Sequence, residues 1–198
     1  WSRGLGDVYK RQVDQSRRNG IRRAHSATHI LHHALQSELG SHAQQQGSKV
    51  DEDWLRFDFT NLEPVNDESL LSIEQDVNSR ISDADAIEWT VLPLAEAREA
   101  GAMMLFGEKY PDPVRMVSMG EFSRELCGGT HLSNTAEVEQ LEITSEEGGA
   151  AGTRRVVALT GPRAAKYRAD IDEAAATAAQ KLGVSETQLT ESIEQLTA

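Results

Sequence analysis

Two pairs of side chains with metal-binding chemistry share one spacing. His25 and His29 are four positions apart, and so are Cys127, the single cysteine of the chain, and His131. Imidazole nitrogens and a thiolate sulfur are ligands that zinc prefers, and together the pairs make a four-ligand set. Taken alone, each pair has a simpler interpretation, as solvent-facing histidines or as a buried thiol beside a surface histidine. Together they favour a metal site.

The first pair requires a helix. Apolar residues recur at three- and four-residue steps between residues 21 and 35, and Gly40 follows, which predicts a helix over 21–39. A helix places His25 and His29 on one face, with Cβ atoms about 5–6 Å apart, and His32 lies near the same face.

The second pair requires a turn. Gly128 and Gly129 stand between Cys127 and His131, and two adjacent glycines disfavour a helix. They suit a tight turn in which backbone N–H groups face a ligand. Because 98 positions separate His29 from Cys127, the fold must bring the helix and the turn together.

The remaining pattern predicts an α+β fold. It is a mixed or antiparallel sheet with helices packed around a zinc cleft, followed by a C-terminal helical extension. Alternating apolar residues predict a strand at 54–59, and a second amphipathic helix begins near Asp67 as its N-cap. The polar stretch 41–49 reads as a loop. Further strands are predicted at 86–92, 114–119, 138–145 and 153–160, and further helices at 94–100 and 163–182.

Charge and composition limit the function classes. The 198 residues carry a net charge of −12, which excludes a uniformly basic nucleic-acid binder. The charge is uneven, since residues 13–50 are net +3 and residues 51–100 net −11, so a polyanion should approach the N-terminal part. No segment approaches the ~18 apolar residues of a membrane span, and we expect no secretory signal. A lone cysteine indicates a reducing compartment, and we expect the cytoplasm.

Several segments in a fixed order resemble the editing domain of alanyl-tRNA synthetases. They are 23–32, 45–48, 55–59, 106–110, 125–131 and 150–155. The resemblance covers 13–161, the predicted editing domain, and 162–198 resembles the start of the helical region that follows it. Residues 1–12 fit poorly with the rest and are predicted to be a non-native leader. Threonyl-tRNA synthetase editing domains share only the paired His and Cys skeleton.

The resemblance implies a hydrolase. It would cleave the ester between serine or glycine and the tRNA for alanine, with Zn²⁺ held by His25, His29, Cys127 and His131. A pocket for alanine cannot strongly exclude glycine or serine, so a second, hydrolytic site is required. The implied partners are the acceptor end of that tRNA and the rest of a synthetase chain, and no membrane is involved. ATP and Mg²⁺ would serve only an aminoacylation domain outside this chain.

The resemblance also implies roles for individual residues. Gln45 matches a glutamine near the substrate and Thr28 lies between the two histidines, although either could have a purely local role. The N–H groups of Gly128 and Gly129 could stabilise an oxyanion. Residues proposed to contact tRNA phosphates are Arg22, Arg23, Arg154 and Arg155.

Three alternatives remain open at this point. A free-standing deacylase that edits in trans shares these motifs. A non-catalytic, zinc-stabilised tRNA-binding module is also compatible, because four protein ligands are typical of structural zinc. A metallohydrolase of another class is disfavoured, because Ser26 rather than Glu follows His25.

Overall fold

The computed structural model describes residues 12–104 and 109–197 and begins with a long helix. Helix α1 (Gln15–Leu39) starts six residues earlier than the apolar pattern predicts, because Asp14 caps it by accepting a hydrogen bond from the Arg17 backbone N–H. It ends at Gly40, whose φ of 107° favours glycine. The predicted end of the helix is confirmed, and its predicted start is wrong.

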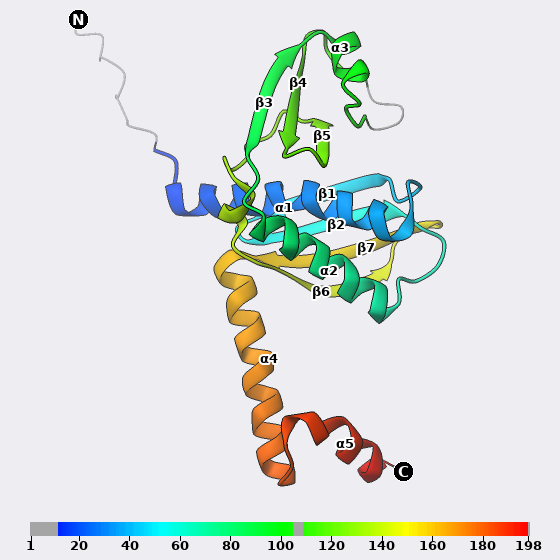
Figure 1. Ribbon diagram of the computed structural model, residues 1–198, viewed down its shortest axis with the longest axis vertical. Helices are drawn as coiled ribbons and strands as arrows, with labels where there is room; N and C mark the ends of the chain where they lie inside the picture. Colours follow the sequence, from blue (N-terminus) through cyan, green and yellow to red (C-terminus); the bar gives the residue numbers. More distant parts are fainter. Residues whose placement is uncertain (1–11, 105–108, 198) are drawn as a thin grey trace, which may run out of the picture.

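A four-stranded antiparallel sheet lies against α1. Its strand order is β1 (Gln45–Asp51), β2 (Trp54–Thr60), β7 (Thr153–Thr160) and β6 (Leu141–Gly148). Helices α1 and α2 (Asp67–Ser82) lie side by side across it (Figure 1). Leu55, Phe57 and Phe59 alternate along β2, and all three are fully buried in the core beneath the helices.

A smaller antiparallel sheet stands beside α1 and carries the second ligand pair. It consists of β3 (Ile87–Leu92), β4 (Val114–Met119) and β5 (Ser123–Leu126), with the short helix α3 (Leu94–Glu99) at its far end (Figure 1). The chain leaves β5 directly into the segment 127–131. Strand β5 was not predicted from the sequence, because its four residues are too few to show a pattern.

The C-terminal residues form helices that project away from the sheets. Helix α4 (Gly161–Leu182) extends from the end of β7, and α5 (Leu189–Thr197) folds back at its far end (Figure 1). Gly183 ends α4 in the left-handed conformation, as expected for the residue after a helix. Among the residues described, no helix combines the length and the apolar character that a bilayer crossing requires.

The predicted fold class is confirmed, and besides the start of α1 three local predictions are wrong. Residues 45–49 belong to edge strand β1, which backbone pairing with β2 holds although its side chains show no apolar alternation. The strand predicted at 138–145 starts later, because Thr135–Val138 forms a 3-10 helix. Asn66, not Asp67, caps α2 by accepting from the Ser69 backbone N–H. Residues 1–11 of the predicted leader and part of the 106–110 motif lie outside the described residues.

Candidate metal centre

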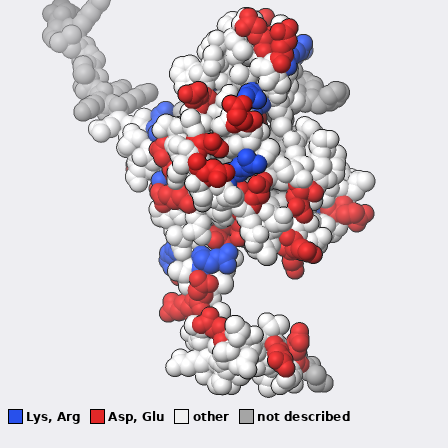
Figure 2. All heavy atoms as spheres, viewed as in Figure 1, with Lys and Arg blue, Asp and Glu red and all other residues white. Residues whose placement is uncertain are grey.

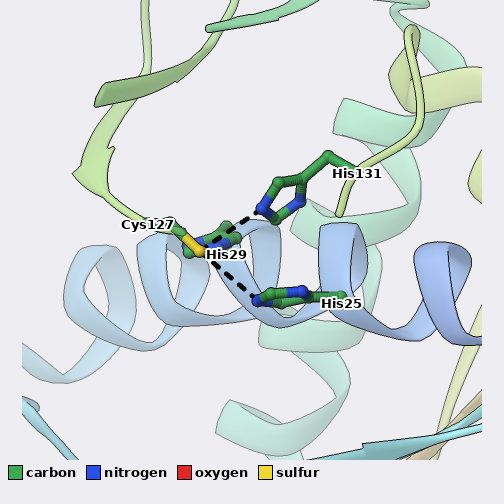
Figure 3. A group of neighbouring side chains, drawn as sticks. All are labelled: His25, His29, Cys127 and His131. Carbon is green, nitrogen blue, oxygen red and sulfur yellow. Dashed lines mark hydrogen bonds between the residues drawn. The ribbon is translucent and has the colours of Figure 1, made fainter. Parts of the chain in front are cut away.

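The structure brings both ligand pairs to one point. One ligand atom from each of His25, His29, Cys127 and His131 lies within 4.8 Å of all the others. The two α1 histidines project from the same side of the helix, and the thiol and the third imidazole approach from the segment after β5 (Figure 3). The juxtaposition expected from the sequence is therefore present in the fold.

The spacing of these atoms fits a tetrahedral zinc set. The Cys127 Sγ atom lies 3.5 Å from His25 Nε2 and 3.4 Å from His131 Nε2. Zinc–sulfur and zinc–nitrogen bonds of about 2.3 and 2.0–2.1 Å imply sulfur–nitrogen edges of about 3.5 Å in a tetrahedron. Among the described residues, the buried His29 Nε2 atom has no partner in hydrogen-bonding geometry, which is the state expected of a nitrogen that binds an ion.

Distant side chains hold the Cys127–His131 segment in place. The Arg115 Nη1 atom donates to the backbone carbonyls of Cys127 and Gly129, each at 2.8 Å. Arg22 Nε donates to the His131 carbonyl at 2.6 Å. These bonds satisfy carbonyls that a loop would otherwise leave to solvent, and they fix where the two ligands point.

Ser26 orients the His131 ring. Its Oγ lies 3.3 Å from His131 Nδ1 and accepts a hydrogen bond from the Leu132 N–H at 3.1 Å. The contact at Nδ1 leaves the opposite ring nitrogen to face Cys127. Ser26 is fully buried beside His25, so one turn of α1 supplies both a candidate ligand and the group that orients another.

Glu125 is the main site residue that sequence reasoning missed. Its Oε2 lies 2.8 Å from His29 Nδ1, and the residue is only 8% exposed. Burial alone would lower the pKa of His29, but the Glu125 carboxylate raises it to about 10. Burial would likewise raise the pKa of Glu125, and the facing His29 lowers it well below its usual range. A carboxylate behind an imidazole is a common second partner of a metal-bound histidine, and cation binding at Nε2 displaces a proton.

The Cys127 thiol is activated as a ligand. Burial would raise its pKa, but hydrogen bonding to His131 and His25 lowers it to about 3. The Gly129 backbone N–H also points to the sulfur at 3.4 Å. These contacts favour the thiolate of Cys127, the form that binds zinc.

Gly129 is a close-packed position, whereas Gly128 is open. A Cβ atom at Gly129 would lie 2.0 Å from His25 Cε1, whereas at Gly128 it would meet nothing within 4 Å. The glycine pair therefore allows the segment to approach the α1 imidazole at one residue only.

Two residues expected at the substrate have local partners here. The Thr28 hydroxyl is buried and donates to the Ala24 carbonyl one turn earlier in α1. The Gln45 amide, on β1, donates to Ser48 Oγ at 3.3 Å. Their expected roles at the ester stay predictions.

Most of the arginines expected to contact tRNA are paired with carboxylates. Arg23 contacts both oxygens of Asp53, Arg154 both oxygens of Glu146, and Arg155 both oxygens of Asp58. Arg22 has a different environment, since its Nε donates to the backbone carbonyl of His131. The sequence could not distinguish these two environments.

Comparison with known families first defines a class. Residues 114–157, from β4 into β7, match the family described as the threonyl and alanyl tRNA synthetase second additional domain. This stretch includes Glu125 and the second ligand pair, Cys127 and His131.

Longer matches then define the particular family. The chain is similar to alanine–tRNA ligases, with 60% identity over 82% of the chain for Rhodopirellula baltica, 48% over 85% for Lactobacillus johnsonii and 43% over 97% for Idiomarina loihiensis. These matches cover 17%, 19% and 22% of the relatives, so the chain spans about a fifth of their length. By these relationships the chain belongs with the alanyl-tRNA synthetases, as a segment, and the resemblance stated from its motifs is confirmed.

Proposed function

We propose that this chain hydrolyses the ester of serine or glycine wrongly attached to the tRNA for alanine, in the cytoplasm and with a zinc ion. The observation that carries the proposal is the convergence of four ligand atoms within 4.8 Å, in a chain related to alanine–tRNA ligases. The need for such an activity is physical, because a pocket that accepts alanine discriminates poorly against one methyl less or one hydroxyl more.

The residues that would hold the ion are His25, His29, Cys127 and His131. Zinc bound there would supply a fixed positive charge beside the ester. Since four protein ligands complete its usual coordination, we assign the ion an organising and electrostatic role. Glu125 and Ser26 would hold the His29 and His131 rings in the orientation that the set requires.

Hydrolysis itself would take place at the open side of the glycine turn. The space beside Gly128 would let an ester carbonyl approach the backbone, where the Gly128 N–H would stabilise the charge that develops on attack by water. The Gly129 N–H points to Cys127 Sγ, so it would contribute only if it left the sulfur. Gln45 is proposed to position the water or to contact the serine hydroxyl. Thr28 would act at the substrate only if its hydroxyl left the Ala24 carbonyl.

The proposed partners are the acceptor end of the tRNA and the remaining parts of a synthetase. For Arg23, Arg154 and Arg155, contact with a phosphate would mean exchanging a protein carboxylate for it. We therefore expect these three to contribute less to tRNA affinity than arginines without such a partner.

The decisive experiment measures release of the amino acid from the tRNA for alanine charged with serine, glycine or alanine. Each substrate is incubated with the protein before and after treatment with a chelator, and again after zinc is restored. Release of serine and glycine but not alanine, lost with the chelator and recovered with zinc, is the expected result. If seryl-tRNA is bound but stays intact in the zinc-loaded protein, the second candidate applies, a zinc-stabilised tRNA-binding module, which the four-ligand set also favours.

A further inference from the structure

A groove adjoins the candidate metal centre on the side of His131. It has a volume of about 430 Å³ and runs between the start of α1, strands β3 and β4, and the segment after β5. Gly129 and His131 form part of its wall. A substrate whose ester lies at the centre would therefore have room to continue into this groove.

The groove has an unusual charge for this chain. Acidic side chains are spread over most of the face shown in Figure 2, with basic ones scattered singly or in small groups among them. Arg18, Arg22 and Arg115 line the groove, against one carboxylate, Glu88. Within the described part of the chain, none of the three arginines has a carboxylate oxygen within 4.0 Å, in contrast to Arg23, Arg154 and Arg155. Their positive charge is therefore available to an anionic ligand.

An exposed aromatic ring lies beside these arginines. Trp89 on β3 is 62% exposed and lines the same groove. The Arg115 guanidinium packs over its ring, with Cζ 5.0 Å from the centroid. An indole backed by a cation, with its remaining surface open, is a platform on which a nucleobase can stack.

We propose that this groove binds the single-stranded RNA nucleotides that precede the esterified one, with a base on Trp89 and phosphates on Arg18 and Arg22. Proximity to the metal centre, guanidiniums that pair with no described carboxylate, and an exposed indole together match the chemistry of a single-stranded RNA end. The assignment rests on the proposed function, because it takes the ester to lie at the metal centre.

Arg22 and Arg115 have two roles in this arrangement, and the test must avoid both residues. Each also holds a carbonyl of the segment that carries Cys127 and His131, so replacing either would disturb the centre itself. Among the described residues, Arg18 and Trp89 make no hydrogen bond or ion pair with that segment. Trp89 packs against Arg115, so the metal content of the Arg18 and Trp89 variants is measured first and should equal that of the unmodified chain.

The experiment uses an RNA hairpin that has a single-stranded 3′ end and carries no amino acid. Its binding to the full chain is measured by fluorescence anisotropy at several salt concentrations. Trp89→Ala should raise Kd about fivefold or more, whereas Trp89→Phe should retain most of the affinity. Arg18→Gln should raise Kd and reduce the slope of log affinity against log salt by about 0.7, the loss of one phosphate contact.

Two control variants match these changes. Val91→Ala alters the same exposed face of β3 outside the groove, and Arg98→Gln removes an exposed arginine on α3. Both should leave Kd unchanged. Unaltered RNA affinity in both Trp89→Ala and Arg18→Gln would overturn the proposal, and so would Arg18-dependent binding of an acidic peptide without any effect on RNA. Because this RNA carries no amino acid, its binding can be measured even if the chain does not hydrolyse the ester. Failure of the RNA-binding proposal and failure of the proposed hydrolysis can therefore be told apart.

Discussion

The two halves of the metal centre have the same sequence spacing but different physical origins. His25 and His29 are one helical turn apart, so α1 places both on one face whatever surrounds it. Cys127 and His131 are also four residues apart, but the segment between them is neither helix nor strand. Its shape depends on hydrogen bonds from Arg22 and Arg115, whose positions in the chain are remote from it.

This difference shows where the precision of the site comes from. An intact α1 is enough to place His25 and His29 on one face. The segment after β5 needs hydrogen bonds from side chains elsewhere in the fold to place Cys127 and His131. We therefore expect substitutions around the Cys127–His131 segment to weaken metal binding even where they touch no ligand. Changes on α1 at residues that contact neither a candidate ligand nor that segment should leave metal binding unchanged.

The largest effect should come from removing a ligand. Cys127→Ala takes the thiolate out of the set, so bound zinc and release of serine from mischarged tRNA should both be lost. We expect more than about a 100-fold loss of metal affinity, beyond what orienting residues contribute. Native mass spectrometry measures the zinc, and a deacylation assay measures the release.

His33→Ala is the matched control for the histidine half. His33 continues the four-residue spacing of His25 and His29 along α1, but its ring contacts Phe122 rather than the cluster. Zinc content should be unchanged in His33→Ala and lost in His29→Ala. Full deacylation by a zinc-free Cys127→Ala protein would refute the proposed function.

The next effect distinguishes the two glycines. Gly129→Ala places a methyl group 2.0 Å from His25 Cε1, so the segment or the ring must move. A displaced ligand should reduce zinc affinity by about 100-fold. Gly128→Ala meets nothing within 4 Å and should bind zinc normally. Competition with a chromogenic chelator measures both, and equal affinities would show that the close approach is not required.

A smaller effect is expected at Glu125, which links the two halves. Glu125→Gln keeps the shape of the side chain but removes the charge that faces His29 Nδ1. Second-partner substitutions of this kind weaken metal binding by about 10–100-fold. Glu121→Gln, at an exposed carboxylate in the turn between β4 and β5, is the control and should leave zinc affinity unchanged. An equal loss in both variants would mean that general acidity, rather than the contact with His29, supports the site.

The sequence reveals the helical half and the core better than the rest, for a physical reason. An element that buries one face has apolar residues at a regular spacing in the sequence, so Leu55, Phe57 and Phe59 predict β2 correctly. Strand β1 has no such spacing of apolar residues, because hydrogen bonding of its backbone to β2 holds it at the sheet edge whatever its side chains are. Apolar periodicity predicts elements whose side chains pack and misses those that depend on backbone pairing.

The same distinction applies to the candidate site. The four possible ligands could be identified from residue type and spacing, because coordination chemistry restricts both. Glu125 could not, since nothing near it in sequence indicates that its carboxylate meets His29, 96 positions away. Nor could the sequence separate Arg22, which holds a backbone carbonyl, from its neighbour Arg23, which pairs with Asp53. These pairings are products of tertiary structure.

The smallest expected effect tests whether α1 supports the distant half through Ser26. Ser26→Ala removes the contact to His131 Nδ1 and leaves the buried Leu132 N–H without its acceptor. An unsatisfied buried donor costs about 1–3 kcal/mol of folding free energy, measured by urea unfolding. Zinc affinity should fall by only a few-fold, because His131 keeps its other anchor, the Arg22 bond to its carbonyl. Ser37→Ala, which removes a similar contact to His33 on the exposed side of α1, should change neither quantity. If both serines behaved alike, α1 would contribute to the site only through the two histidines that it carries.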